Sequence, residues 1–294
     1  MLGVVIQILI NGLISGSGIA LLAVALQVVY FPTRVLFIGL AGIYALAPFL
    51  ARAALLAGLG WQLAIGLTII AGALVSVLCE LLNHRRLARL RVSDSAHLIA
   101  SLGSYILLVQ IIAMVWGNES RRLDARIGSP THLGGAIITD AQWITLAASS
   151  SLLLGFGSLL NYTGIGLRLR TLADNPNMLA LFGYDVLRHR VFAFMMSGIF
   201  GSAAALVAAY DVGFEPQAGL HAILLAVVAV IIGGRASFFG PVVGALLLGF
   251  LRAEVVWYFS ARWEEAASFG LLAIFLLVRP DGLFGRSDGL GAPS

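Results

Sequence analysis

Residues 166–190 form a polar stretch between two long apolar segments, and they carry the residue pattern with the clearest functional meaning. Asp174 or Asn175 can cap the first amides of a short helix, and Pro176 suits its first position. Gly183 suits the left-handed position just past the end of that helix. A helix of about two turns is marginal alone in water, so another part of the protein or a partner must hold it.

The predicted short helix also carries apolar side chains, although it lies in a polar stretch: Met178, Leu179, Leu181 and Phe182. Exposed, adaptable apolar groups commonly mark the surface that a partner protein covers. The same side chains could instead fold back onto the protein's own helices. Both interpretations remain open.

Catalytic chemistry has little support elsewhere in the chain. All 18 basic residues are Arg, so the chain lacks the Lys with which a Walker A loop reaches the phosphates of a nucleotide. If ATP drives this protein, a partner must bind it. No His has another His or Cys at metal-ligand spacing, and Glu80 and Glu254 stand isolated, so neither a metal site nor an enzyme is predicted.

The composition predicts a membrane protein. Hydrophobic residues make up 60% of the 294, and charged residues only 11%, against about 25% in soluble domains. One membrane-spanning helix takes about 20 apolar residues. We therefore expect an all-α polytopic membrane bundle of eight to ten spans. The net charge of +4 fits basic loops of a membrane protein rather than binding of nucleic acid.

Apolar stretches and glycines outline the predicted spans. The seventh and ninth stretches are short, and the tight joint 233–238 after the seventh could belong to a broken or re-entrant helix pair. Residues 1–285 should form one transmembrane domain, followed by a short disordered tail at 286–294. The nine stretches are 4–29, 36–57, 61–83, 97–116, 142–160, 191–210, 219–232, 239–257 and 266–278.

Arginine distribution predicts the orientation. If the loop at 84–96 is cytoplasmic, alternation places twelve Arg on the cytoplasmic side and six on the other, as the positive-inside rule favours. The N-terminus is then outside and the C-terminus inside. Loop 117–141 would be external, either as a solvated connector or as a docking face for an external protein.

Polar groups inside the spans are candidates for a substrate path, although most Ser and Thr in such helices bond their own backbone. His221 and Glu254 fall near predicted outer ends, where water reaches them. The path candidates are Asn11, Ser15, Ser101, Ser104, Ser197, Gly233 and Gly234.

Several motifs, in order along nearly the whole chain, resemble the permease subunits of branched-chain amino acid ABC importers. The polar stretch resembles the coupling loop of that family at Arg170, Ala173, Asp174, Asn175, Pro176, Gly183, Asp185 and Val186. Further matches are Asn11-Gly12-Leu13, residues 98–103, Phe194 with Ser197 and Gly198, Gly213 with Pro216 and Gly219, residues 230–234, and Arg279-Pro280-Asp281-Gly282-Leu283-Phe284-Gly285.

The resemblance implies a multi-pass protein of the bacterial inner membrane that transports by alternating access. Two permeases, usually different chains, would pair in the bilayer; two cytoplasmic ATPases would dock on the coupling loops; and an external binding protein would deliver substrate. ATP and Mg would bind only the ATPases, and no cofactor would bind this chain directly. Coupling would use the matched loop residues together with Met178, Leu179 and Phe182.

Two departures from the family pattern leave the substrate open. Met178 and Leu179 stand where small alanines are usual, and residues 36–42 lack the Asn and His of a usual Asn-Phe-Ala-His-Gly stretch. Branched-chain or similar small amino acids are the favoured cargo, with urea or short amides as alternatives. An ion-coupled secondary transporter is a further alternative, although few membrane-embedded ionisable residues are available for it.

Overall fold

The computed structural model describes residues 2–90, 92–123, 131–133, 136–234 and 237–284. The predicted tail at 286–294 lies outside the described residues. The elements are α1 (Leu2–Thr33), α2 (Gly39–Leu56), α3 (Trp61–Cys79), a π-helical segment (Glu80–His84), α4 (Arg85–Arg89), α5 (Asp94–Trp116), β1 (Thr131–Leu133), β2 (Ala136–Ile138), α6 (Asp140–Tyr162), α7 (Gly164–Asp174), α8 (Pro176–Leu181), α9 (Val186–Asp211), α10 (Ala218–Gly233), α11 (Gly240–Tyr258), a 3-10 turn (Ala261–Trp263) and α12 (Glu264–Val278).

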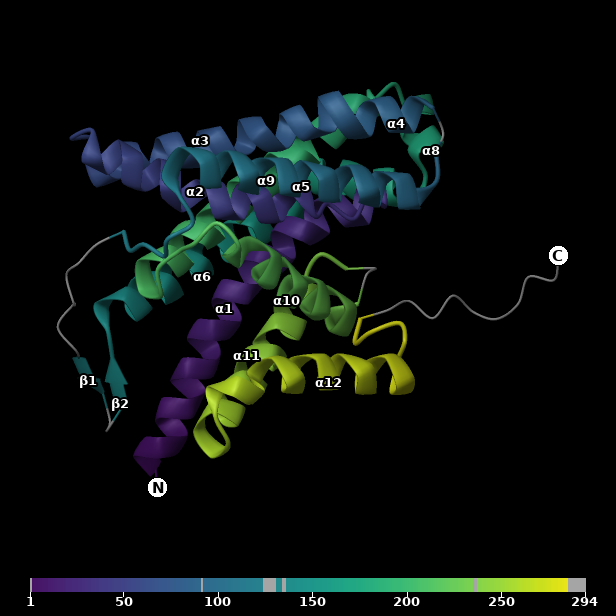
Figure 1. The fold of residues 1–294 in the computed structure, drawn as a ribbon. Coiled ribbons are helices and arrows are strands. Elements are labelled where there is room, and N and C mark those ends of the chain that lie inside the picture. The colour runs from purple at the N-terminus through teal and green to yellow at the C-terminus, as the bar shows by residue number, and fades with distance from the viewer. Residues whose placement is uncertain (1, 91, 124–130, 134–135, 235–236, 285–294) are drawn as a thin grey trace.

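The predicted helical membrane bundle is confirmed, and each of the nine apolar stretches contains a helix. In the described part of the chain, seven helices are long and apolar enough to cross a bilayer, and α10 is a shorter apolar helix. We expected eight to ten spans, and the described residues form seven candidate spans and this one shorter apolar helix. Figure 1 shows the helices running between two ends of the bundle, with α4 and α8 at one end and the N-terminus and both strands at the other. We call the end with α4 and α8 the Arg-rich end, and the end with the N-terminus and both strands the opposite end.

Glycines let the helices pack backbone against backbone. A Cβ added to Gly249 of α11 would lie 2.4 Å from the Gly12 carbonyl oxygen of α1, and one on Gly198 of α9 would lie 2.4 Å from the Gly72 carbonyl oxygen of α3. Small residues at such crossings are what helix association in lipid requires, because it depends on close van der Waals contact. The α1–α11 and α3–α9 contacts are thus fixed by residue size.

The tight joint between the seventh and eighth stretches is a helical hairpin. α10 ends at Gly233 and α11 begins at Gly240, and an added Cβ on Gly233 would lie 2.0 Å from the Gly240 carbonyl oxygen. The last carbonyls of α10 are satisfied from a distant segment: the amides of Leu283 and Phe284 donate to Ile232 and Gly233 over 2.9 and 3.1 Å. The closing motif of the chain therefore serves as the C-terminal cap of α10.

A two-stranded antiparallel hairpin departs from the all-α expectation. Thr131 pairs with Ile138 and Leu133 with Ala136. The Gln7 side chain of α1 accepts from the Ile137 amide at 2.8 Å and donates to its carbonyl at 3.2 Å, which satisfies an edge of the hairpin. Gly134-Gly135 before the apolar run Ala136-Ile137-Ile138 is a turn signal in the sequence, and it was available to predict this hairpin.

Candidate functional site: a coupling segment and a polar cavity

The short helix predicted in the polar stretch is confirmed as α8. The Asn175 side chain accepts from the amides of Asn177 and Met178 at 3.0 and 3.1 Å, and Pro176 occupies the first turn. Gly183 adopts a positive φ of 80° just after the helix. Of the two possible caps, Asn175 performs the role. Capping at both ends makes a six-residue helix well defined despite its length.

The apolar side chains of α8 divide between two surroundings. Leu179 is buried, with 1% of its surface exposed, so this residue folds back on the protein. Met178, Leu181 and Phe182 are 52%, 87% and 69% exposed at the Arg-rich end. Leu179 anchors the helix, and the other three side chains form an apolar surface that we call the α8 knob. Docking of a partner on this knob stays a prediction.

Other residues of the predicted coupling set fix the segment on either side of α8. Arg170 donates to the Asn161 side chain at 3.1 Å, and the Asp185 carboxylate accepts from the Leu187 and Arg188 amides as the N-cap of α9. Ala173 packs against the core and Asp174 ends α7. The α8 knob is thus joined to α9 by a short capped turn.

A buried ion pair links α9 to the π-helical segment that continues α3. Glu80, predicted as isolated, is fully buried and receives two hydrogen bonds from Arg190, at 2.7 Å from Nε and 3.3 Å from Nη2. The prediction was wrong because the partner lies 110 residues away. Glu80 opens the π-helical segment, and such segments are frequent at functional sites.

Two histidines lie beside that ion pair. The Nδ1 atoms of His84 and His97 are 3.2 Å apart, and the ring of Phe37 packs edge-on against His84. Sequence spacing had not joined these histidines, because they lie on different helices. The pair connects the π-helical segment to the start of α5, so the ion pair and the histidines together tie three helices at the Arg-rich end.

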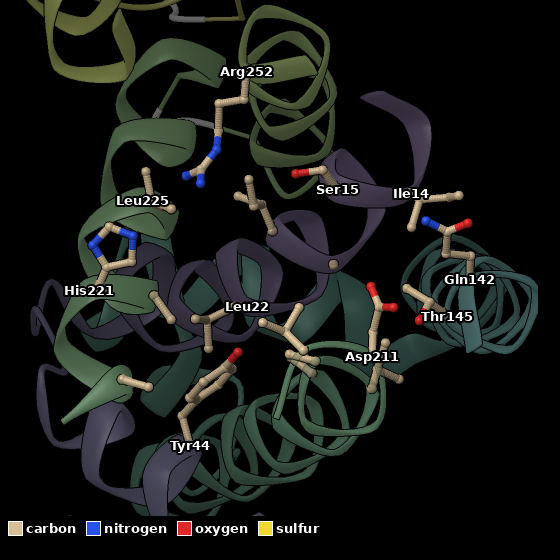
Figure 2. A pocket seen from close by; sticks show the side chains of 18 of the residues that line it. Ile14, Ser15, Leu22, Tyr44, Gln142, Thr145, Asp211, His221, Leu225 and Arg252 are labelled. Atoms are coloured by element: carbon tan, nitrogen blue, oxygen red, sulfur yellow. The ribbon is translucent and has the colours of Figure 1, made fainter. Parts of the chain in front are cut away.

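A cavity of about 480 Å³ opens between α1, α2, α6, α9, α10 and α11. Figure 2 shows Arg252, Asp211, His221 and Tyr44 on different walls of it. The further polar lining residues are Asn11, Ser15, Gln142 and Thr145. Ligand sites in proteins commonly combine such a volume with apolar walls and a few polar groups, so this polar cavity can hold a small solute.

The predicted path residues separate into two sets. Asn11 and Ser15 line the polar cavity. The hydroxyl of Ser101 instead accepts from the Gly39 amide at 2.9 Å, Ser104 accepts from Asn83 at 2.7 Å, and Ser197 is buried beside the α3–α9 contact. Gly233 and Gly234 lie at the α10–α11 hairpin. A place on the substrate path stays a prediction for all seven.

Sequence reasoning missed Arg252 and Asp211, and for His221 it favoured an interfacial position over a place on the substrate path. His221 does lie near the end of the bundle, 3.6 Å from Glu265, but it also lines the cavity. Arg252 and Glu254 are the two charged residues of the otherwise apolar α11, and such a charge inside a span is the signal that could have singled out Arg252.

Comparisons with known proteins agree with the motifs. Residues 8–278 match the family described as "Branched-chain amino acid transport system / permease component". The chain is 27% identical to the high-affinity branched-chain amino acid transport system permease protein LivH of Escherichia coli K12, and 24% identical to BraD of Pseudomonas aeruginosa, in both cases over 96% of each chain. It is 28% identical to the autoinducer 2 import system permease protein LsrC of Klebsiella pneumoniae, over 52% of this chain and 44% of that protein.

One solved structure shares the fold. PsaBC from Streptococcus pneumoniae, determined in complex with Fab, superimposes with a TM-score of 0.53 at 13% identity, over 93% of this chain and 92% of that chain. At this level of identity the likeness concerns the arrangement of helices alone.

Proposed function

The chain belongs to the branched-chain amino acid transport permease family of ABC importers, and on that premise we propose that it carries branched-chain or similar small amino acids by alternating access. It is a multi-pass membrane permease component and not an enzyme, homologous to permeases of bacterial inner membranes. The observation that carries the proposal is α8, a rigidly capped short helix whose apolar knob projects from the Arg-rich end.

In the proposed mechanism, the α8 knob seats in a groove of a partner ATPase. Exposed apolar groups gain free energy when a partner covers them, so docking has a physical driving force. ATP and Mg bind the ATPase pair, whose closure displaces α8. A second permease chain and an external binding protein complete the proposed assembly, and the binding protein would meet the opposite end of the bundle.

Helix α9 is the mechanical link in this mechanism. Its first residue follows the N-cap Asp185, directly after α8, and its last turns, from Ala204 to Asp211, line the polar cavity. At 1.5 Å per residue its 26 residues span about 39 Å. A tilt imposed on the start of α9 therefore changes the cavity at its far end, which couples docking to solute access.

Removing the knob should uncouple transport without unfolding the protein. For the double variant Leu181→Ser/Phe182→Ser, we expect loss of ATPase co-purification and of import in proteoliposomes. The free energy of unfolding should change by no more than about 0.5 kcal/mol per exposed site. Leu56→Ser, an exposed leucine at the opposite end, is the matched control and should retain ATPase binding. Import at the wild-type level in the double variant would refute the docking role.

Orientation can be tested with thiol labelling in a Cys79→Ala background, which removes the one native cysteine. A membrane-impermeant maleimide applied to intact spheroplasts should label Leu56→Cys but not Arg188→Cys, since the Arg-rich end should face the cytoplasm. Arg188 is exposed and should become reactive once the membrane is permeabilised. Labelling of Arg188→Cys in sealed cells would place the α8 knob on the wrong side for an ATPase.

A further inference from the structure

We propose that a small apolar pocket between the last turns of α1, α10 and α12 binds an anionic phospholipid, with an acyl chain in the pocket and the phosphate group at Arg34 and Arg279. This role goes beyond transport, and it does not depend on which solute the permease carries.

The apolar pocket has a volume of about 240 Å³ and shares no lining residue with the polar cavity. Tyr30 is the one polar side chain that the described residues place in its wall. The other helical lining residues are Leu26, Val227, Val230, Ile231 and Leu276. Three helices thus enclose a space that offers almost no hydrogen bonding, which suits a hydrocarbon chain rather than a polar solute.

The apolar pocket lies near the ends of its helices. Because α1 begins at the opposite end, its last turns with Leu26 and Tyr30 lie toward the Arg-rich end (Figure 1). Val230 and Leu276 likewise fall within the last four residues of α10 and α12. Leu276 is 47% exposed and its neighbour Leu277 is 86% exposed, so the α12 wall opens to the outside of the bundle, where lipid lies.

A lipid acyl chain is the occupant that this location supplies. Transfer of such a chain from the bilayer gains little hydrophobic free energy, because lipid tails are as apolar as leucine. An empty pocket, however, forfeits the dispersion contacts of the atoms that line it, and an acyl chain restores them. Tyr30 suits the boundary between hydrocarbon and headgroups, since its ring is apolar and its hydroxyl polar.

Two arginines bring positive charge to the rim of the apolar pocket. Arg279 directly precedes the lining residue Pro280, so their Cα atoms lie about 3.8 Å apart. Arg34 is two residues from the lining residue Leu36, which keeps their Cα atoms within about 7 Å. Both arginine side chains are exposed, and neither forms an ion pair with any residue that the structure describes.

The charge at this rim selects the headgroup. Asp281 is the one acidic residue in segments 30–36 and 276–282, so the two arginines leave the rim net positive. Guanidinium groups form charge-assisted hydrogen bonds with phosphate, and each basic residue beside an anionic membrane surface contributes about fivefold in affinity. Phosphatidylglycerol keeps the full negative charge of its phosphate, whereas the choline of phosphatidylcholine cancels it. The rim therefore favours phosphatidylglycerol.

Native mass spectrometry of the full-length chain tests the headgroup. The protein is released from neutral detergent that contains equal amounts of dioleoylphosphatidylglycerol and dioleoylphosphatidylcholine, and the retained lipid is identified by its mass. We expect phosphatidylglycerol to be retained in preference. Arg34→Gln and Arg279→Gln should each lower its retention about fivefold. Arg86→Gln is the matched control, because Arg86 is exposed at the same end and lines no part of the pocket.

A second pair of variants tests the acyl chain. Leu276→Trp places a larger side chain in the wall of the apolar pocket and should abolish the retention of phosphatidylglycerol. Leu277→Trp makes the same change at the next residue, which does not line the pocket, and should leave retention intact. Both leucines are substantially exposed, so neither change disturbs the core and both variants should fold.

Four results would overturn the proposal. The wild type could retain both lipids equally, or the double variant Arg34→Gln/Arg279→Gln could keep the wild-type preference. Leu276→Trp could retain phosphatidylglycerol fully while weakening the pairing of two permease chains, which would assign this face to a second chain. Excess inorganic phosphate could displace the lipid, which would reveal a phosphate site that has no need of an acyl chain.

Discussion

Glu80→Gln is expected to lower the free energy of unfolding by about 3 kcal/mol, because it leaves the largely buried Arg190 cation without its counter-charge. The substitution keeps the shape of the side chain, so the loss reports charge rather than a cavity. Equilibrium unfolding in detergent, followed by tryptophan fluorescence, measures it. The double variant Glu80→Gln/Arg190→Gln should lose less free energy of unfolding than the single variant Glu80→Gln, since no unpaired charge remains.

The matched control for this ion pair lies two residues away. Arg188 pairs with Asp185 at 3.4 Å, but the two side chains are 86% and 50% exposed. Exposed pairs contribute at most about 1 kcal/mol, so Arg188→Gln should have a small effect. If Glu80→Gln were as mild as Arg188→Gln, the buried pair would not be a structural link between α9 and the π-helical segment.

Gly249→Leu is expected to prevent recovery of folded protein. The new Cβ would meet the Gly12 carbonyl oxygen, the Gly16 amide nitrogen and the Gly16 Cα, at 2.4, 2.4 and 2.5 Å. These are backbone atoms, so α1 and α11 must separate to relieve the clash, at a cost of about 3 kcal/mol or more. The monodisperse fraction in size-exclusion chromatography provides the readout.

Gly66→Leu is the corresponding control. An added Cβ at Gly66 of α3 has no heavy atom within 4 Å, so leucine fits there without displacing a neighbouring helix. We expect a monodisperse fraction close to that of the wild type. Similar yields for the two variants would show that the α1–α11 contact tolerates separation, contrary to the packing described.

Local sequence signals predicted the local structure well. Apolar length gave nine stretches that each contain a helix, and Asn175, Pro176 and Gly183 marked both ends of α8. These features depend on neighbouring residues only, because caps and hydrophobic length act within a few positions. The exposure of Phe182 and the burial of Leu179 were undecidable, since they depend on which helices surround α8.

Long-range pairing could not be predicted from one sequence. Glu80 meets Arg190, His84 meets His97, and Ser101 receives the Gly39 amide only because helices distant along the chain pack together. The polar cavity is the same kind of feature, with Asn11, Asp211 and Arg252 contributed by three helices. Residue type singled out Asn11, but nothing near Asp211 in the sequence indicated the space it faces.

The cap on α10 has a consequence for biosynthesis. The carbonyls of Ile232 and Gly233 receive their donors from Leu283 and Phe284, about fifty positions later. A nascent chain therefore carries unsatisfied carbonyls at the base of this hairpin until residues 283 and 284 have been synthesised. A segment translated about fifty residues later completes a helix that entered the membrane earlier, so a message truncated shortly before codon 283 should yield a permease with an unfinished α10.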